Sequence, residues 1–394
     1  MRSTTPGLLA VIAATSILAA CALPGTGTSP SPSTRPTTAP TGSLAPTPTP
    51  NVCTNQRVLA TWSLTRLAEQ TLVVPVEETD VASVTAEVAA GAGGVILFGS
   101  SAPATLASGL HALAAVAPGG IAPFVMTDEE GGVVQRMANL VGSLPSARQM
   151  AATMSPAQIR QLVTTIALRM RAAGVTMDLA PVLDLDNGVG PNNRDPDGTR
   201  SFSLNATVTA ADGVAFMQGL EAGGVVPVVK HFPGLGQASG NTDVAPATTQ
   251  PWTSLQHAGL LPFQSSIRAG APVVMIANAT VPGLSSLPAS ISPVVMTTVL
   301  RDQLRFQGLM ITDSLSAGAL ADIGYPVPRA VVAAITAGAD MVLYTAAAAQ
   351  VASLTASTAA ALVAAVNAGT LDRSRLMNAV ANILNAKRVD LCAA

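Results

Sequence analysis

Residues 225–231 read VVPVVKH, and residues 308–313 read GLMITD. Each stretch is a short run of strand-forming apolar residues that ends in a side chain able to ionise, Lys230 with His231 in the first and Asp313 in the second. An apolar run without alternation is typical of a strand buried on both faces, as in a parallel sheet. The two segments therefore predict a parallel sheet with charged groups at the carboxyl ends of its strands.

The same pattern recurs along the chain. Further apolar runs cover residues 94–98, 123–126, 175–180, 273–277 and 341–344. Helix-forming segments lie between them, at 156–173, 206–222, 293–304 and 328–337. About eight such units in roughly 340 residues predict a single (β/α)8 barrel of the TIM type. A doubly wound open sheet is the alternative, but the Gly-x-Gly-x-x-Gly that it would need after its first strand is absent.

In a barrel, all the carboxyl ends of the strands meet at one mouth, where side chains from different strands can form a pocket. Only 11% of the residues are charged, so ionisable groups at several strand ends indicate a functional site. Carboxylates with Arg and Lys suit a polyhydroxylated substrate, and two carboxyl groups can flank a glycosidic bond.

Other functions lack their signatures. The three histidines are scattered and no His-x-His or His-Glu-x-x-His occurs, so we expect neither a metal nor another cofactor. The Gly-x-Ser-x-Gly of serine hydrolases is also absent. A net charge of −2 argues against a nucleic-acid partner, which would require a basic face.

The N-terminal segment predicts export. Residues 1–20 carry one charge, Arg2, and an apolar run that ends in Leu-Ala-Ala before Cys21. This pattern resembles the cleavage box of bacterial lipoproteins and predicts a signal peptide over 1–20, lipidation of Cys21 and anchoring to the outer face of the cell membrane. An ordinary secretory signal is the alternative. Residues 21–52 are rich in Pro, Thr and Ser and predict an extended linker.

Two cysteines then remain, Cys53 and Cys392, at the two ends of the predicted catalytic domain, residues 53–394. Because an exported chain folds in an oxidising compartment, we expect a disulfide between them. Two separate buried thiols are the alternative.

Six ordered motifs carry a family resemblance. They are TDEEGGVVQR (127–136), APVLD (180–184), TRSF (199–202), VKHFPGLG (229–236), ITDSL (311–315) and AGADMV (337–342). Together they resemble glycoside hydrolase family 3, in its β-N-acetylhexosaminidase branch, over residues 58 to 388. Longer members of the family carry a second α/β sandwich domain, for which this chain leaves no room. The resemblance implies a retaining enzyme that removes non-reducing terminal N-acetylglucosamine (GlcNAc) through a covalent glycosyl-enzyme.

The resemblance also assigns roles to residues. It implies that Asp313 is the nucleophile and that Asp184 is a supporting carboxylate. The side chains that hold the sugar hydroxyls are implied to be Asp128, Arg136, Arg200, Lys230 and His231.

The acid/base loop departs from the family pattern. Asp243 stands where the branch usually has a proton-donating His, Asn241 stands where that His has its carboxylate partner, and Leu235 replaces another usual His. Asp243 is therefore the candidate general acid/base, with Glu129 or Glu130 as alternatives. The Gly- and Ser-rich loop around Asp243 predicts a mobile lid.

An exported lipoprotein meets peptidoglycan, so the expected substrates are peptidoglycan fragments or muropeptides that contain GlcNAc linked to N-acetylmuramic acid (MurNAc). Chitin oligosaccharides, β-glucosides and a phosphorolytic reaction are alternatives within the family. From another class, the chain could be a non-catalytic sugar-binding lipoprotein.

Overall fold

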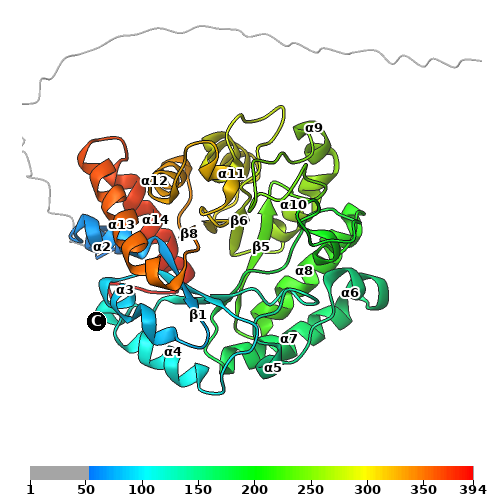
Figure 1. Cartoon of the computed structure of the whole chain (residues 1–394), viewed down its shortest axis with the longest axis horizontal. Helices are drawn as coiled ribbons and strands as arrows, with labels where there is room; N and C mark the ends of the chain where they lie inside the picture. The colour runs from blue at the N-terminus through cyan, green and yellow to red at the C-terminus, as the bar shows by residue number, and fades with distance from the viewer. Residues whose placement is uncertain (1–52, 394) are drawn as a thin grey trace, which may run out of the picture. The chain divides into compact units, whose positions relative to one another are not determined.

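The structure is a computed structural model that describes residues 53–393 (Figure 1). The predicted signal peptide, the predicted lipidation site Cys21 and the predicted linker up to residue 52 lie outside the described residues.

Eight parallel strands form the barrel that the sequence predicts. They are β1 (Leu72–Glu77), β2 (Gly94–Phe98), β3 (Phe124–Thr127), β4 (Met177–Asp178), β5 (Val226–Phe232), β6 (Val273–Ile276), β7 (Leu309–Thr312) and β8 (Val342–Leu343). Neighbours in sequence pair in parallel from β1 to β7, and β8 pairs with β1. A parallel bridge between Ile311 and Met341 joins β7 to the start of β8 and closes the ring.

Helices surround the strands (Figure 1). The longer ones are α4 (Leu106–Ala115), α7 (Pro156–Ala172), α8 (Ala206–Ala222), α10 (Leu260–Arg268), α12 (Val327–Ala337), α13 (Val351–Asn367) and α14 (Arg373–Ala386). The shorter ones are α1 (Asn55–Leu59), α2 (Leu64–Gln70), α3 (Thr85–Ala90), α5 (Ala138–Val141), α6 (Ala147–Thr153), α9 (Trp252–Ser254) and α11 (Gly318–Ala321). Two π-helices cover Leu255–Gly259 and Val294–Gln303, and 3₁₀ turns cover Val81–Val84, Pro118–Gly120, Gly198–Arg200, Ala289–Ile291 and Ala348–Gln350.

Most predicted elements appear within one or two residues of their expected bounds, with three differences. Strand β1 was not among the predicted runs. Strand β4 keeps only two of the six expected residues, although the N–H groups of Thr176 and Leu179 on either side of it still donate to Val125 and Thr127. The helix predicted over 293–304 adopts π geometry from Val294 to Gln303.

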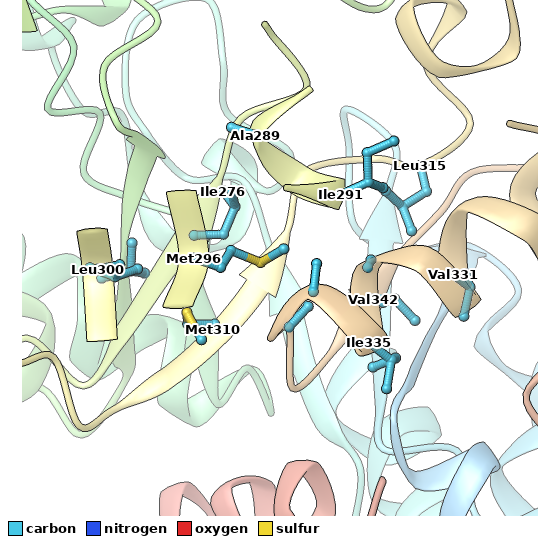
Figure 2. Close-up of a cluster of buried hydrophobic side chains, with 14 of the residues drawn as sticks. Ile276, Ala289, Ile291, Met296, Leu300, Met310, Leu315, Val331, Ile335 and Val342 are labelled. Atoms are coloured by element: carbon cyan, nitrogen blue, oxygen red, sulfur yellow. The ribbon is translucent and has the colours of Figure 1, made fainter. Parts of the chain in front are cut away.

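Apolar side chains fill the barrel and the space between strands and helices. Figure 2 shows part of the outer core, where Ile276, Met296, Met310, Ile335 and Val342 pack together, each at most 1% exposed. Burial of such side chains is the main favourable term for folding.

The C-terminal helix α14 covers part of the barrel interior, since its Ile383 packs with the inward-facing strand residues. Buried Asp340 holds this helix in place. Its carboxylate accepts hydrogen bonds from Arg301 Nη2 at 2.8 Å, from Arg375 Nη2 at 2.9 Å and from the backbone N–H of Met310 at 3.0 Å. The motif that contains Asp340 therefore has a structural role in this chain.

The two ends of the described chain lie side by side, and a disulfide joins Cys53 to Cys392 with a Cα–Cα distance of 5.8 Å. Near it, Asn55 in α1 donates to the carbonyl of Val389 at 2.9 Å and accepts from the N–H of Leu391 at 2.7 Å. The segment Ala348–Asn367 is long and apolar enough to span a membrane, but it packs against α2, α12 and β1 as part of the helical ring.

Candidate active site

A cavity of about 430 Å³ opens at the carboxyl ends of the strands. Its volume lies within the range of small-molecule sites, roughly 300–1,000 Å³. All seven residues predicted for catalysis or sugar binding line it, namely Asp128, Arg136, Arg200, Lys230, His231, Asp243 and Asp313. The convergence predicted from the strand ends is therefore present in the fold.

Strand β5 delivers two adjacent side chains to this cavity. Consecutive residues of a regular strand point to opposite faces. Between Val229 and Phe232 the pairing of β5 with β6 shifts register, and such an irregularity can redirect side chains. Lys230 and His231 accordingly both line the cavity.

A network of opposite charges forms one wall. Lys230 Nζ lies 2.9 Å from Asp128 Oδ1 and 2.6 Å from Glu130 Oε1. Arg200 donates two hydrogen bonds to Glu130, from Nε to Oε2 at 2.7 Å and from Nη2 to Oε1 at 2.8 Å. Arg136 Nη2 lies 3.5 Å from Asp128 Oδ2. These ion pairs hold the side chains in fixed positions before a sugar binds. Fewer side-chain conformations are then lost on binding, so the entropic cost of binding is smaller.

The same network sets the charge of its members. Burial disfavours the ionised form of Asp128, but Lys230 and Arg136 outweigh that effect and lower the pKa of this carboxyl. Burial likewise opposes ionisation of Glu130, and Arg200 with Lys230 more than compensates, so the Glu130 pKa falls far below its usual range. The pKa of Lys230 is raised, because Asp128 and Glu130 overcome the effect of its burial. All three side chains are therefore charged at neutral pH.

Asp184 lies behind His231, outside the cavity lining. One carboxylate oxygen is 2.6 Å from His231 Nδ1 and 3.0 Å from the backbone nitrogen of His231, while the other accepts from the N–H of Leu235 at 2.6 Å. Burial raises the pKa of Asp184 to about 7 and lowers that of His231 to about 4. At neutral pH the imidazole is thus uncharged, and Asp184 fixes the orientation of its ring.

Asp313 follows β7 and is held by backbone contacts. Its N–H donates to the carbonyl of Ile276 at 2.9 Å, and its Oδ1 accepts from the N–H of Ser314 at 2.7 Å. Burial raises the pKa of Asp313, and the carboxylate of Asp243 raises it further, whereas His231 acts in the opposite direction.

Asp243 lies on the loop after β5 and is exposed at the cavity. Its N–H donates to Asn241 Oδ1 at 2.9 Å, and its carbonyl accepts from the N–H of Gly318 at 3.0 Å. The carbonyl of Thr242 likewise accepts from the N–H of Ala319 at 3.0 Å. Partial removal from water raises the pKa of Asp243, and Arg200 opposes that shift. The predicted lid is thus tied by its backbone to the first residues of α11.

The two alternative proton donors are placed less well for that role. Glu129 lies outside the cavity lining, where it accepts from Gln135 Nε2 and from the N–H of Arg136, both at 2.8 Å. Glu130 lines the cavity but is held ionised by Lys230 and Arg200. Asp243 is therefore better placed than either glutamate to donate a proton.

Sequence reasoning missed the structural importance of Glu130 and Asp197. Glu130 follows Asp128 by two residues, and residues two apart in extended chain share a face, which is a signal that could have been used. Asp197 precedes Arg200 by three residues, and its Oδ1 lies 3.7 Å from Arg200 Nη1. Within the described part of the chain neither oxygen of Asp197 has a hydrogen-bond partner, and burial raises the pKa of this carboxyl to about 8.

Asp184, Asp197 and His231 also have ligand atoms within 4.8 Å of one another, a spacing that a metal ion could bridge. The oxygens of Asp184 already accept hydrogen bonds from His231 and Leu235. Its observed contacts therefore serve to position the neighbouring residues.

Comparison with known proteins agrees with this geometry. Residues 70–386 match the glycosyl hydrolase family 3 N-terminal domain. The chain is 39% identical over 264 residues to the beta-hexosaminidase LpqI of Mycobacterium tuberculosis, a match that covers 64% of this chain and 66% of that relative. A beta-hexosaminidase of Nitrosospira multiformis is 35% identical over 259 residues, covering 64% of this chain and 72% of the relative.

Solved structures give the same result. M. tuberculosis LpqI superposes with a TM-score of 0.75 at 31% identity, over 85% of this chain and 96% of that chain. The beta-N-acetylhexosaminidase of Beutenbergia cavernae superposes with a TM-score of 0.75 at 30% identity, over 84% and 100% of the two chains. Because the family domain covers most of the chain and these structures share its fold, the chain belongs to glycosyl hydrolase family 3.

Proposed function

We propose that the chain is a retaining β-N-acetylglucosaminidase that removes non-reducing terminal GlcNAc from peptidoglycan fragments. The observation that carries this proposal is the meeting of Asp313 and Asp243 in one cavity, beside a preorganised wall of charged groups. The family relatives include a beta-hexosaminidase and a beta-N-acetylhexosaminidase, which supports an N-acetylhexosamine such as GlcNAc as the sugar.

In this mechanism, Asp313 attacks the anomeric carbon while a carboxylic acid protonates the departing oxygen. Buried Asp313 carries the covalent sugar, and Asp243 first donates a proton and then takes one from the attacking water. Lys230, Arg200, Asp128 and the neutral His231 ring offer donors and acceptors to the sugar hydroxyls.

The direct test compares a chromogenic GlcNAc β-glycoside with the matching glucoside. We expect turnover of the first only, and a fall of several orders of magnitude in kcat for Asp313→Ala. Asp322→Ala, which removes an exposed carboxylate at the end of α11, is the matched control and should keep full activity. Turnover of the glucoside alone would indicate a β-glucosidase, and no turnover of either would favour a sugar-binding protein.

Adding inorganic phosphate to the same assay separates hydrolysis from phosphorolysis. Hydrolysis yields free GlcNAc whether phosphate is present or absent. Appearance of the sugar 1-phosphate in its place would identify a glycoside phosphorylase.

Asp243 is tested through the leaving group. Asp243→Ala should slow substrates with poor leaving groups most, because an activated leaving group departs without a proton. Azide should partly restore turnover of activated substrates by attacking the glycosyl-enzyme that has lost its base. A uniform loss of a few fold on every substrate would remove Asp243 from this role.

Export and lipidation at Cys21 belong to the same proposal. Their support is the N-terminal sequence, together with a Cys53–Cys392 disulfide that an oxidising compartment would allow. Labelled fatty acid should enter the wild-type protein and not Cys21→Ser. Equal labelling of the two proteins, or none in either, would contradict the anchor.

A further inference from the structure

The segments that leave the strands at the cavity end carry few cations. Among the described residues they are Arg136, Arg148, Lys230, Arg194 and Arg200. The first three are occupied: Arg136 and Lys230 pair with Asp128, and Arg148 donates to the carbonyls of Asp186, Gly198 and Ser201.

Arg200 is occupied as well, by its two hydrogen bonds to Glu130. Arg194 differs from the other four. It is exposed, and within residues 53–393 its guanidinium has no carboxylate or carbonyl partner. Among the residues that the structure describes, its only hydrogen-bond partner is Asn192, whose Oδ1 accepts from the backbone N–H of Arg194 at 2.9 Å.

The position of Arg194 links it to one side of the cavity. Pro191 and Pro196, which flank it in sequence, both line the cavity. The carbonyl of the preceding residue, Asn193, accepts a hydrogen bond of 3.3 Å from the N–H of Asn241. Asn241 in turn caps the N–H of Asp243. Arg194 is not itself among the lining residues, but the backbone next to it is hydrogen-bonded to the loop that carries the proposed proton donor.

A general acid protonates the oxygen of the leaving group, so the side of the cavity beside Asp243 is the side that receives the leaving sugar. The cavity lining holds four carboxylates, those of Asp128, Glu130, Asp243 and Asp313, against three cations that are already paired. Because Asp243 carries its proton when substrate binds, three charged carboxylates then face three paired cations, so none of the lining cations is free to pair with an anionic leaving sugar.

We propose that Arg194 determines leaving-group specificity by pairing with a carboxylate on the departing sugar, such as the lactyl carboxylate of MurNAc. This inference rests on the proposed function and adds to it a residue that selects acidic over neutral disaccharides. Arg is suited to the role because its guanidinium binds carboxylates in a bidentate manner and stays charged at any physiological pH.

The test measures binding of two probes to the Asp313→Asn protein, in which cleavage is blocked. The probes are GlcNAc-β-1,4-MurNAc, which is acidic, and GlcNAc-β-1,4-GlcNAc, which is neutral. Adding Arg194→Gln should lower the ratio of acidic to neutral affinity about three- to fivefold, the effect of an exposed ion pair. Arg194→Lys should retain part of the preference for the acidic disaccharide, because the positive charge is kept. In the Asp313→Asn protein with Arg194 intact, about 0.5 M salt should reduce the same preference by screening the ion pair.

Arg160→Gln is the matched control, since Arg160 is an exposed arginine on α7 in the outer ring. It should leave the ratio unchanged. The inference is overturned if Arg194→Gln leaves the ratio of acidic to neutral affinity unchanged, or if Arg160→Gln lowers that ratio by the same factor. Cleavage of neither disaccharide by the wild-type protein refutes the proposed function itself, so the two failures are distinguishable.

Discussion

Replacing Glu130 by Gln removes the charge at the centre of the cavity wall while keeping the side-chain size. Glu130 is 4% exposed and contacts two cations, with Arg200 Nε at 2.7 Å and Lys230 Nζ at 2.6 Å. In Glu130→Gln, Lys230 keeps Asp128 as its only carboxylate partner among the described residues. Arg200 keeps its 3.0 Å hydrogen bond to the carbonyl of Pro196 and, as its only remaining carboxylate there, Asp197 at 3.7 Å. The substitution therefore leaves a buried positive charge without compensation.

The expected loss of stability follows from that charge. Breaking a buried ion pair by removing one partner costs about 3–5 kcal/mol. For a domain of about 340 residues the entropy of unfolding is roughly 0.7 kcal/mol/K, so Tm should fall by ~4–7 °C. Activity should fall as well, because hydrogen bonds to charged groups contribute about 1.5–3 kcal/mol each. Misplacing one or two of them lowers kcat/KM by about 10- to 10⁴-fold.

Two measurements separate the causes. Thermal unfolding should show that adding Lys230→Met to Glu130→Gln recovers part of the lost Tm, because the uncompensated charge is gone. Hydrolysis of the chromogenic GlcNAc glycoside should stay low in the double variant, since Lys230 no longer meets the sugar. A Glu130→Gln protein with unchanged Tm and unchanged kcat/KM would refute the role assigned to this network.

Three further outcomes are expected. Asp340→Ala should lower stability by about 3–5 kcal/mol, because two partly buried arginines lose their carboxylate, and activity at low temperature should persist; an unchanged urea midpoint would contradict this. Burial raises the pKa of Asp197 to about 8, so the folded state keeps a proton that the unfolded chain releases above about pH 4. The wild type should therefore lose stability relative to Asp197→Asn as pH rises from 4 to 8, and a Tm difference independent of pH would exclude it. Cys392→Ser should lower stability by about 6 kcal/mol in the chain-entropy account, since the disulfide closes a separation of 339 residues; denaturant unfolding that matches the wild type would argue against it.

The barrel could be predicted because continuous apolar strands report burial on both faces, a property of each segment alone. The runs at 94–98 and 273–277 agree with β2 and β6 within one residue. The contribution of α14 could not be predicted in the same way. Its amphipathic sequence shows that one face is buried, but contact between Ile383 and the barrel interior depends on how the whole ring closes.

In the site, too, some features follow from local sequence and others depend on the closed fold. Strand-end position was enough to bring Asp128, Lys230 and Asp313 together, because the topology of a barrel forces these ends to one mouth. The pairing of Glu130 with both Lys230 and Arg200 depends on side-chain geometry across three strands and loops. The two-residue spacing from Asp128 indicates only that Glu130 faces the same side as Asp128. Its contacts with Lys230 and Arg200, which make it the centre of the network, come from the structure.

The two carboxylates proposed for catalysis differ in a way that suits their separate tasks. The N–H of Ser314 donates to Asp313 Oδ1 at 2.7 Å, a hydrogen bond that favours the ionised form of Asp313 against the effect of burial. Asp243 lacks such a hydrogen bond to its carboxylate among the described residues and is exposed to solvent. A sugar that enters the cavity displaces water from Asp243, and desolvation raises the pKa of a carboxyl group. Substrate itself would thus drive the two pKa values apart, keeping a proton on the acid while the nucleophile stays charged.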